Sequence, residues 1–200
     1  MIGLPLAPKL AQIEIGSIAL EILNVPFIRQ PPQMLCFPYS VSMVIEYFRR
    51  TENPELNVPE ISPSDLVRIL NTDPERGTVL SSATIKKLNE YINPIEFVQY
   101  RGNIEKLDEC FERRTPPILV FNAMYYFYSE EGPAHATVYL GRTETKIITN
   151  NPWMGEYYPY DLEKFQDAWE IENYRMVVPR IKKIKDSKLN KFISDEEEGI

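Results

Sequence analysis

The residues that could carry out covalent chemistry are few in this chain. The sequence contains one histidine, His135, and two cysteines, Cys36 and Cys110. An imidazole exchanges a proton near neutral pH, and a cysteine thiolate is a strong nucleophile. One cysteine and one histidine are therefore enough for acyl transfer through a covalent thioester, provided that the fold brings them together.

The single histidine also excludes other kinds of site. Zinc sites of the HExxH, three-histidine and Cys2His2 types need more ligands than this chain has, and the two cysteines match no metal-ligand spacing. The eight glycines are scattered and form neither a phosphate-binding loop, a GxGxxG turn nor a GxSxG elbow. We therefore expect no metal and no cofactor.

Cys36 directly precedes a predicted helix. Apolar residues follow at helical spacing, and Pro38 suits a first turn, so we predict a helix from about Phe37 to Arg50 with an apolar face of Val41, Val44, Ile45 and Phe48. A helix N-terminus carries partial positive charge and free N–H groups, which lower a thiol pKa and stabilise an oxyanion. Cys36 is therefore the candidate nucleophile.

A side-chain amide could complete the oxyanion site. Gln30 lies six residues before Cys36, and Pro31 and Pro32 stiffen the connection between them. Its N–H group could stabilise the negative oxygen that forms during acyl transfer. Gln33 is also near the cysteine, so the sequence leaves both glutamines open and favours Gln30.

His135 begins one of two strand-like segments, and Asn151 ends the other. If the chain folds as a hairpin centred on Thr143, Asn151 lies directly opposite His135, and its amide oxygen can accept a hydrogen bond from the imidazole. That bond would fix the tautomer and orientation of the ring. The alternate residues Ala136, Val138 and Leu140 should pack on the other face.

The remaining pattern predicts an α+β fold, mainly helical in the first half and mainly sheet in the second. Strands are expected within 13–28, over Ile95 to Tyr100, and in the segments ILVFNA, HATVYLG, TKIITNN and YRMVVP after Pro117. The aromatic run 125–128 is interpreted as a strand packing the core rather than as a cleft wall. Further helices are expected from Pro63 to Leu70, from Ser81 or Ser82, around Ile104 to Phe111, and over Asp161 to Trp169.

These segments together resemble a known family. The run VPFIRQPPQMLCFPYSVSMVIEYF resembles the nucleophile segment of papain-like cysteine peptidases, most of all the C39-like peptidase family. A histidine opening a strand, then IITNNPW and then YDLEKFQDAW, is similar to the second half of that family, and the resemblance runs from about Val25 to Pro179. It implies a papain-like fold in which the nucleophile helix packs on a C-terminal antiparallel sheet.

The resemblance implies a role for each candidate residue: Cys36 as nucleophile, His135 as general base and acid, Asn151 as orienting residue and Gln30 as oxyanion donor. The sequence differs from the family pattern at Phe37, where glycine is usual, and has Asn151 where C39-like sequences more often have aspartate. The implied activity is a cysteine peptidase or amidohydrolase that acts on a peptide or protein.

Three alternatives stay open at this stage. A papain-like domain could bind a peptide without turning it over, with Phe37 filling the space near the thiol. The same catalytic residues could instead serve a deamidase or an amide acyltransferase. Finally, Cys36 and Cys110 could form a disulfide, although two cysteines in 200 residues fit a reducing compartment better.

Composition sets the remaining expectations. With 22 basic and 29 acidic residues the formal net charge is −7, which argues against nucleic-acid binding. No apolar run is long enough to span a membrane, and the N-terminus lacks a signal-peptide pattern, so we predict a cytoplasmic protein. The predicted organisation is a lead-in over 1–24, one domain over 25–179 and a charged tail over 180–200.

Overall fold

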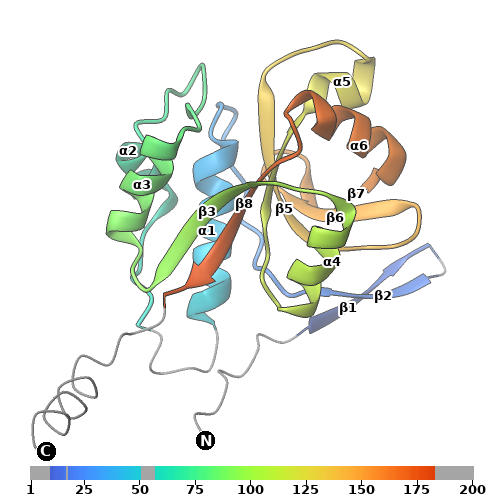
Figure 1. The fold of residues 1–200 in the computed structure, drawn as a ribbon, viewed down its shortest axis with the longest axis horizontal. Helices are drawn as coiled ribbons and strands as arrows, with labels where there is room; N and C mark the ends of the chain where they lie inside the picture. The colour runs from blue at the N-terminus through green and yellow to red at the C-terminus, as the bar shows by residue number, and fades with distance from the viewer. Residues whose placement is uncertain (1–9, 17, 51–56, 183–200) are drawn as a thin grey trace, which may run out of the picture.

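The computed structural model describes residues 10–16, 18–50 and 57–182, which fold around one six-stranded antiparallel sheet (Figure 1). Its strands lie in the order β3-β8-β4-β5-β6-β7, so β3 and β7 are the edges. Their bounds are β3 Ile95–Arg101, β4 Ile118–Asn122, β5 Ala134–Arg142, β6 Lys146–Asn151, β7 Gly155–Asp161 and β8 Arg175–Ile181. A separate antiparallel hairpin, β1 (Leu10–Ile15) with β2 (Ile18–Leu23), precedes this unit.

Helices pack on both faces of the sheet. In the described part of the chain they are α1 Cys36–Arg49, α2 Pro63–Ile69, α3 Ser82–Tyr91, α4 Ile104–Glu112, α5 Ala123–Tyr128 and α6 Leu162–Ile171. The first three share one apolar core with the sheet, and α4 and α6 share a second core on its other face. The fold is therefore α+β, with the helices of the first half packed on an antiparallel sheet, as the sequence predicted.

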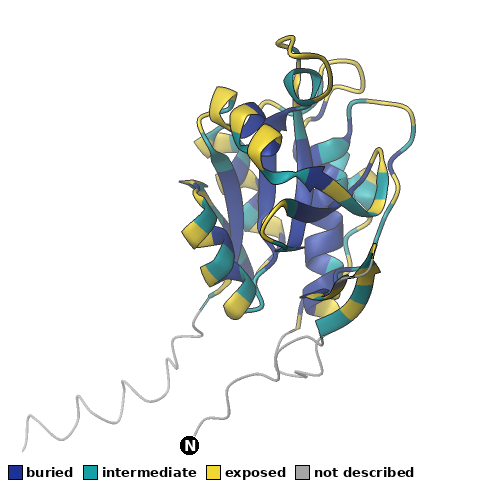
Figure 2. Cartoon of the chain, turned by 90° about the vertical axis from the view of Figure 1, so that its right-hand side faces the viewer, coloured by how far each residue is buried: buried dark blue, intermediate teal, exposed yellow. Residues whose placement is uncertain are grey.

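Alternation along the central strands creates the two cores. On β5, Ala136, Val138 and Leu140 belong to the core with α1, whereas Tyr139 belongs to the core with α4 and α6. Side chains of successive strand residues point to opposite faces, so one buried strand serves both layers. The predicted face of this strand is confirmed, and Figure 2 shows buried residues along the central strands with exposed residues on the outer sides of the helices.

Helix α1 is buried on nearly all sides. Ten of its 14 residues are buried, including the four that the apolar spacing identified. The helix ends within one residue of the predicted bounds, and it begins at Cys36 itself rather than at Phe37. Because the hydrophobic effect favours burial of such a surface, α1 is held firmly against the sheet and its N-terminal residue has a fixed position.

The β5–β6 hairpin forms, but its predicted register is wrong. Val138 pairs with Asn150, and an irregularity after Tyr139 shifts the pairing by one residue nearer the turn. The turn is centred between Glu144 and Thr145 rather than on Thr143, because the Thr143 hydroxyl accepts hydrogen bonds from the N–H groups of the two residues that follow Glu144. Sequence spacing alone did not reveal this side-chain turn.

The aromatic run 125–128 is a helix, α5, and its interpretation as a core strand is wrong. The Asn122 side chain caps this helix by accepting from the N–H of Tyr125 at 3.0 Å. Ser129 ends it in the left-handed conformation, with φ 56°. Capping and the packing of two of the aromatic rings on the second core outweigh the strand propensity of these residues.

Strand β7 was not predicted from the sequence. It contains Pro159, which cannot donate a ladder hydrogen bond, and it lies at the edge of the sheet. Edge positions tolerate proline because one side of the strand needs no partner. One of its last residues, Tyr160, nevertheless lines the site described below.

The chain ends lie partly outside the described residues. The predicted lead-in contains the β1–β2 hairpin, so the expectation of one or two strands there is confirmed, with earlier bounds. Strand β8 continues to Ile181, within the range predicted as the tail, and residues 183–200 lie outside the described part. No helix among the described residues is long and apolar enough to cross a membrane.

The close approach of Gly102 to Trp169 and Met176 gives a direct test of the second core. A Cβ atom on Gly102 would lie 2.6 Å from the Trp169 ring and from the Met176 sulfur. Because the ring is buried and rigid, we expect Gly102→Ala to lower the free energy of unfolding by about 1–3 kcal/mol, measured by urea denaturation. Gly141→Ala is the matched control: its nearest atoms would be at 3.4 Å, and an equal loss in both variants would contradict this packing.

Candidate active site

Cys36 lies at the N-terminus of α1, half-buried and facing β5. The first turn of the helix contains no acidic residue, and Leu35 before it makes no side-chain cap. The partial positive charge of the helix end is therefore directed at the thiol without a competing anion. Phe37, at the position where the resemblance led us to expect glycine, is only 4% exposed and belongs to the core against which Cys36 also packs.

His135 lies at the start of β5, next to Cys36 and Asn151. Its Nε2 is 3.0 Å from the Asn151 Oδ1 atom. The observed register places the two residues diagonally rather than opposite each other, a separation that side chains of this size can bridge. On β4, Phe121 pairs with His135 and meets its ring edge to face, with ring centres 5.7 Å apart.

The hydrogen bonds of Asn151 determine the histidine tautomer. Its Oδ1 accepts from the N–H groups of Trp153 at 2.8 Å and Met154 at 3.0 Å. Both partners are donors, so the atom facing them must be the oxygen and not the amide nitrogen. The same oxygen faces His135, so Nε2 of the ring must carry a proton, and Nδ1 is left to interact with the thiol.

The thiol and the imidazole shift each other's pKa. Burial raises the pKa of Cys36, but the positive charge of His135 and hydrogen bonds from that ring and from the backbone N–H groups of Ala136 and Phe37 outweigh it, so the pKa lies below its usual value. Burial lowers the pKa of His135, but the Cys36 thiolate and the hydrogen bonds to Cys36 and Asn151 raise it overall. The pair thus favours a thiolate beside an imidazolium.

Gln30 lines the same pocket as Cys36, whereas Gln33 is exposed. The Gln30 Nε2 donates to the Gln33 carbonyl at 2.5 Å, and its buried Oε1 has no hydrogen-bond partner. The amide nitrogen has a second hydrogen besides the one used by Gln33. Gln30, and not Gln33, is therefore the glutamine that the fold brings to the thiol.

Two further contacts fix the Gln30 segment to the turn after Asn151. The backbone N–H of Gln30 donates to the Pro152 carbonyl at 2.9 Å. The Arg29 guanidinium donates to the Trp153 carbonyl at 3.0 Å. The segments that carry the candidate oxyanion donor and the orienting residue thus hold each other in place.

Three residues near the site were not identified from the sequence. Tyr160 on β7 accepts a hydrogen bond from the Asn151 amide nitrogen through its hydroxyl. Asn150 donates to the Val25 carbonyl at 2.8 Å and so fixes the start of the domain to β6. Asn122 donates to the Gly132 carbonyl at 2.8 Å and so holds the loop before His135. Asn150 and Asn151 are adjacent in the sequence, but the sequence analysis assigned a role only to Asn151.

A pocket of about 360 Å³ opens over the thiol and the imidazole. One wall comes from α5 and the loop after it, and the other from the turn between β6 and β7. The lining residues are Gln30, Met34, Cys36, Ala123, Met124, Phe127, Tyr128, Pro133, Ala134, His135, Asn151, Trp153, Met154 and Tyr160. All four candidate residues from the sequence analysis therefore face one pocket.

Cys110 is separated from this site. It lies in α4, is buried in the core on the other side of the sheet, and both cysteines are free thiols, so the Cys36–Cys110 disulfide is not formed. Burial and the neighbouring Glu109 raise the pKa of Cys110 to about 11. Among the described residues, no group of three or more histidine, cysteine, aspartate or glutamate side chains is placed to hold a metal ion.

A cysteine at the start of a buried helix, packed against an antiparallel sheet that presents a histidine, is the architecture of the papain-like cysteine peptidases. A family model described as Peptidase C39 like family matches residues 22–177. The chain belongs to this C39-like peptidase family. None of the curated proteins matches the sequence.

Two solved structures have the same fold. One was assigned as a C39-like peptidase from Bacillus anthracis; it is 16% identical, with a TM-score of 0.59 over 80% of this chain and 96% of that chain. The other is a double glycine motif protease from an AMS/PCAT transporter in complex with the leader peptide, 18% identical with a TM-score of 0.59, covering 80% of this chain and 94% of that chain.

The contacts of Asn151 predict how substitutions there behave. In Asn151→Asp, a carboxylate can accept from His135 and from both backbone N–H groups, and the Tyr160 hydroxyl can turn to donate. We expect the variant to fold normally and to raise the pKa of His135 further, because an anion then faces the imidazole. In Asn151→Leu these donors lose their acceptor, which should lower the free energy of unfolding by about 1–3 kcal/mol.

His135 is the chain's only histidine, so an NMR titration reports its pKa from a single set of imidazole signals. Urea denaturation of the same variants gives their stabilities. If the His135 pKa were the same in wild type and Asn151→Asp, the two side chains would not be in contact in solution.

Proposed function

We propose that this protein is a cysteine peptidase-like hydrolase that cleaves a peptide or amide bond through Cys36, His135, Asn151 and Gln30. Family membership and fold support a cysteine peptidase. The observation that carries the assignment of residues is the shared pocket, in which a low-pKa thiol lies beside an imidazole whose other nitrogen is fixed by Asn151.

The acylation step follows from the charges of this pair. The Cys36 thiolate attacks the carbonyl carbon of the substrate, and the carbonyl oxygen becomes an oxyanion near the N-terminus of α1 and the Gln30 amide. His135 then gives its Nδ1 proton to the departing amine, the carbon–nitrogen bond breaks, and a thioester with Cys36 remains. Neutral His135 keeps its Nε2 hydrogen bond to Asn151.

Deacylation reverses these roles. His135 removes a proton from a water molecule, which attacks the thioester carbonyl carbon. The carbon–sulfur bond breaks, the acid product leaves, and the thiolate and imidazolium return. If the bond cleaved is a side-chain amide, the same steps give deamidation, and if an amine takes the place of water, the same residues transfer the acyl group instead.

A peptide is the substrate class that we propose. The transporter protease with a similar fold was solved in complex with a leader peptide, and a pocket with apolar walls beside the thiol suits an extended chain. The alternative of a binding domain with Phe37 filling the space near the thiol receives less support, because that side chain is buried in the core with α1 and does not line the pocket.

The nucleophile assignment predicts unequal reactivity of the two thiols. At neutral pH we expect iodoacetamide to alkylate Cys36 at least about tenfold faster than Cys110, because only the thiolate reacts and the pKa of Cys36 is lowered while that of Cys110 is about 11. Acidification through the lowered pKa protonates the thiolate and should slow the Cys36 reaction. Peptide mass spectrometry of both sites measures the two rates.

His135→Ala provides the control for this experiment. Burial of Cys36 persists in the variant while the cation is lost, so the pKa of the thiol should rise and alkylation at neutral pH should slow by about tenfold or more. Equal, slow labelling of both cysteines in wild type would contradict the assignment of Cys36 as the nucleophile.

The two glutamines predict a second contrast. Gln30→Ala should lower kcat for an internally quenched peptide pool by about 10²–10³-fold, the usual effect of removing one oxyanion donor. Alkylation of Cys36 should change little, because no oxyanion forms in that reaction. Gln33→Ala removes an exposed side chain of the same type three residues away and should leave kcat close to wild type. Equal effects of the two substitutions would exclude Gln30 as the oxyanion donor.

A further inference from the structure

The carboxamide of Asn151 has a requirement that a carboxylate would not have. A side-chain amide contains two N–H donors besides its oxygen, and a buried donor without an acceptor costs free energy. Asn151 is only 1% exposed. The resemblance to C39-like sequences led us to expect aspartate more often at this position, and a carboxylate has acceptor oxygens only. Asparagine therefore needs an acceptor near its nitrogen that aspartate would not need.

Tyr160 on β7 supplies this acceptor. The Nδ2 atom of Asn151 donates to the Tyr160 hydroxyl, and this nitrogen forms no other hydrogen bond with the described residues. Burial raises the pKa of Tyr160 well above its usual value, so the phenol stays neutral and accepts through an oxygen lone pair. The hydroxyl thus meets the requirement of the amide without adding a charge beside His135.

The surroundings of Tyr160 offer the amide no substitute. Tyr160 is fully buried, and its ring packs on Phe121 and Phe165 with ring centres 5.2 and 5.4 Å away. Phe121 also meets the ring of His135, 5.7 Å between centres. These phenylalanine side chains contain no oxygen or nitrogen acceptor. If the hydroxyl were removed, the Asn151 nitrogen would face aromatic carbon on this side.

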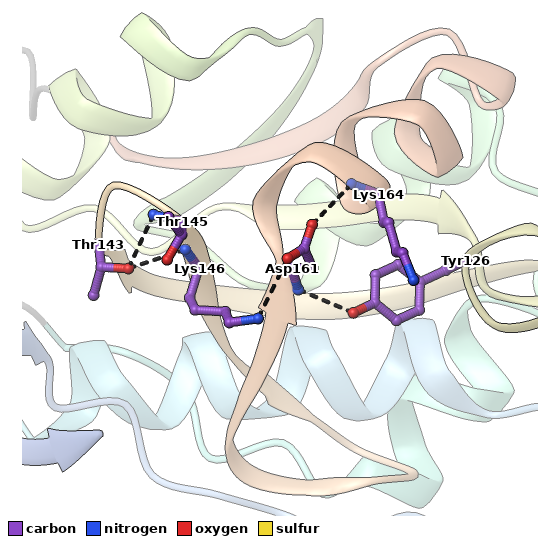
Figure 3. Close-up of polar contacts among 6 residues, drawn as sticks. All are labelled: Tyr126, Thr143, Thr145, Lys146, Asp161 and Lys164. Carbon is purple, nitrogen blue, oxygen red and sulfur yellow. Dashed lines mark hydrogen bonds and ion pairs between the residues drawn. The ribbon is translucent and has the colours of Figure 1, made fainter. Parts of the chain in front are cut away.

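The residue after Tyr160 fixes the end of β7 from three directions. Figure 3 shows the backbone N–H of Asp161 donating to the Tyr126 hydroxyl, at 2.9 Å. The Asp161 carboxylate pairs with the Lys146 ammonium at 3.3 Å and accepts from the N–H of Lys164 at 3.3 Å. The position of the Tyr160 hydroxyl is therefore determined by the fold, and the Asn151 amide adapts to it.

We propose that Tyr160 is a positioning residue of this enzyme, whose hydroxyl holds the Asn151 carboxamide with its oxygen on His135. This inference rests on the proposed hydrolase function and adds a residue that acts through Asn151. Without the hydroxyl, the amide turns toward another acceptor and its oxygen leaves the imidazole. An aspartate at position 151 has no N–H to satisfy, so the requirement for Tyr160 arises from the asparagine.

The substitution Tyr160→Phe retains the ring and removes only the acceptor. The hydrogen bond to Asn151 raises the pKa of His135, so its loss should lower that pKa, by about 0.5 or more, in an NMR titration of the chain's one histidine. We expect kcat for the internally quenched peptide pool to fall about tenfold or more, because the imidazole is misplaced, while KM changes little. An unchanged His135 pKa would overturn the proposal.

The Asn151→Asp background tests whether Tyr160 acts through the amide nitrogen. The carboxylate can still accept from His135 and from the N–H groups of Trp153 and Met154, and it has no donor that needs the hydroxyl. We expect Tyr160→Phe to change the His135 pKa clearly less in this background than in wild type, a non-additive pair of substitutions. Additive shifts would show that Tyr160 acts by another route and would contradict the proposal.

Tyr158→Phe is the matched control. Tyr158 lies on the same strand, its ring centre is 4.8 Å from that of Tyr160, and its hydroxyl makes no hydrogen bond to Asn151. The His135 pKa and kcat should stay close to wild type in this variant. Equal effects of Tyr158→Phe and Tyr160→Phe would assign the effect to general packing and reject a specific role of Tyr160. Urea denaturation establishes conditions in which all variants are folded.

These results are independent of the nucleophile test. Fast alkylation of Cys36 in wild type, together with an unchanged His135 pKa in Tyr160→Phe, would retain the hydrolase and reject the positioning role. Slow alkylation in wild type, together with a lowered and non-additive His135 pKa shift, would reject the hydrolase and leave Tyr160 as the residue that orients Asn151.

Discussion

The site depends on one side-chain oxygen. The Oδ1 atom of Asn151 accepts from the N–H groups of Trp153 and Met154 and faces the imidazole of His135. Its amide nitrogen donates to Tyr160. One buried carboxamide therefore closes the β6–β7 turn, fixes the imidazole orientation and joins the edge strand to the site. Since every polar group of this side chain is satisfied, its orientation is determined by the fold rather than by the histidine.

The position and electrostatic surroundings of the thiol depend on a different constraint, the burial of α1. Because this helix is enclosed by the first core, its N-terminus cannot move away from the sheet, and the charge at that end is directed at Cys36. Phe37 contributes to this burial. Phe37, which follows the candidate nucleophile, therefore adds apolar contact beneath the helix and is not among the residues that line the pocket.

The two walls of the pocket are formed by elements that depend on side-chain contacts for their position. Helix α5 is short and contains no buried residue, yet the capping side chain Asn122 fixes its N-terminus and the Tyr126 hydroxyl joins it to the end of β7. The facing turn is fixed by Asn151 itself. The same contacts that orient the imidazole thus also fix one wall of the pocket that contains Cys36.

The amino-acid sequence by itself determined the α+β class, the helix after Cys36, the strand that begins with His135 and the residues that could form the site. These follow from local periodicity and from the chemistry of a chain with one histidine. Tertiary structure decided the hairpin register, the helical state of residues 125–128, the edge strand that carries Tyr160 and the choice of Gln30 over Gln33. Each of these depends on side-chain hydrogen bonds and packing between residues distant in sequence, which outweigh local propensity and which spacing along the chain does not encode.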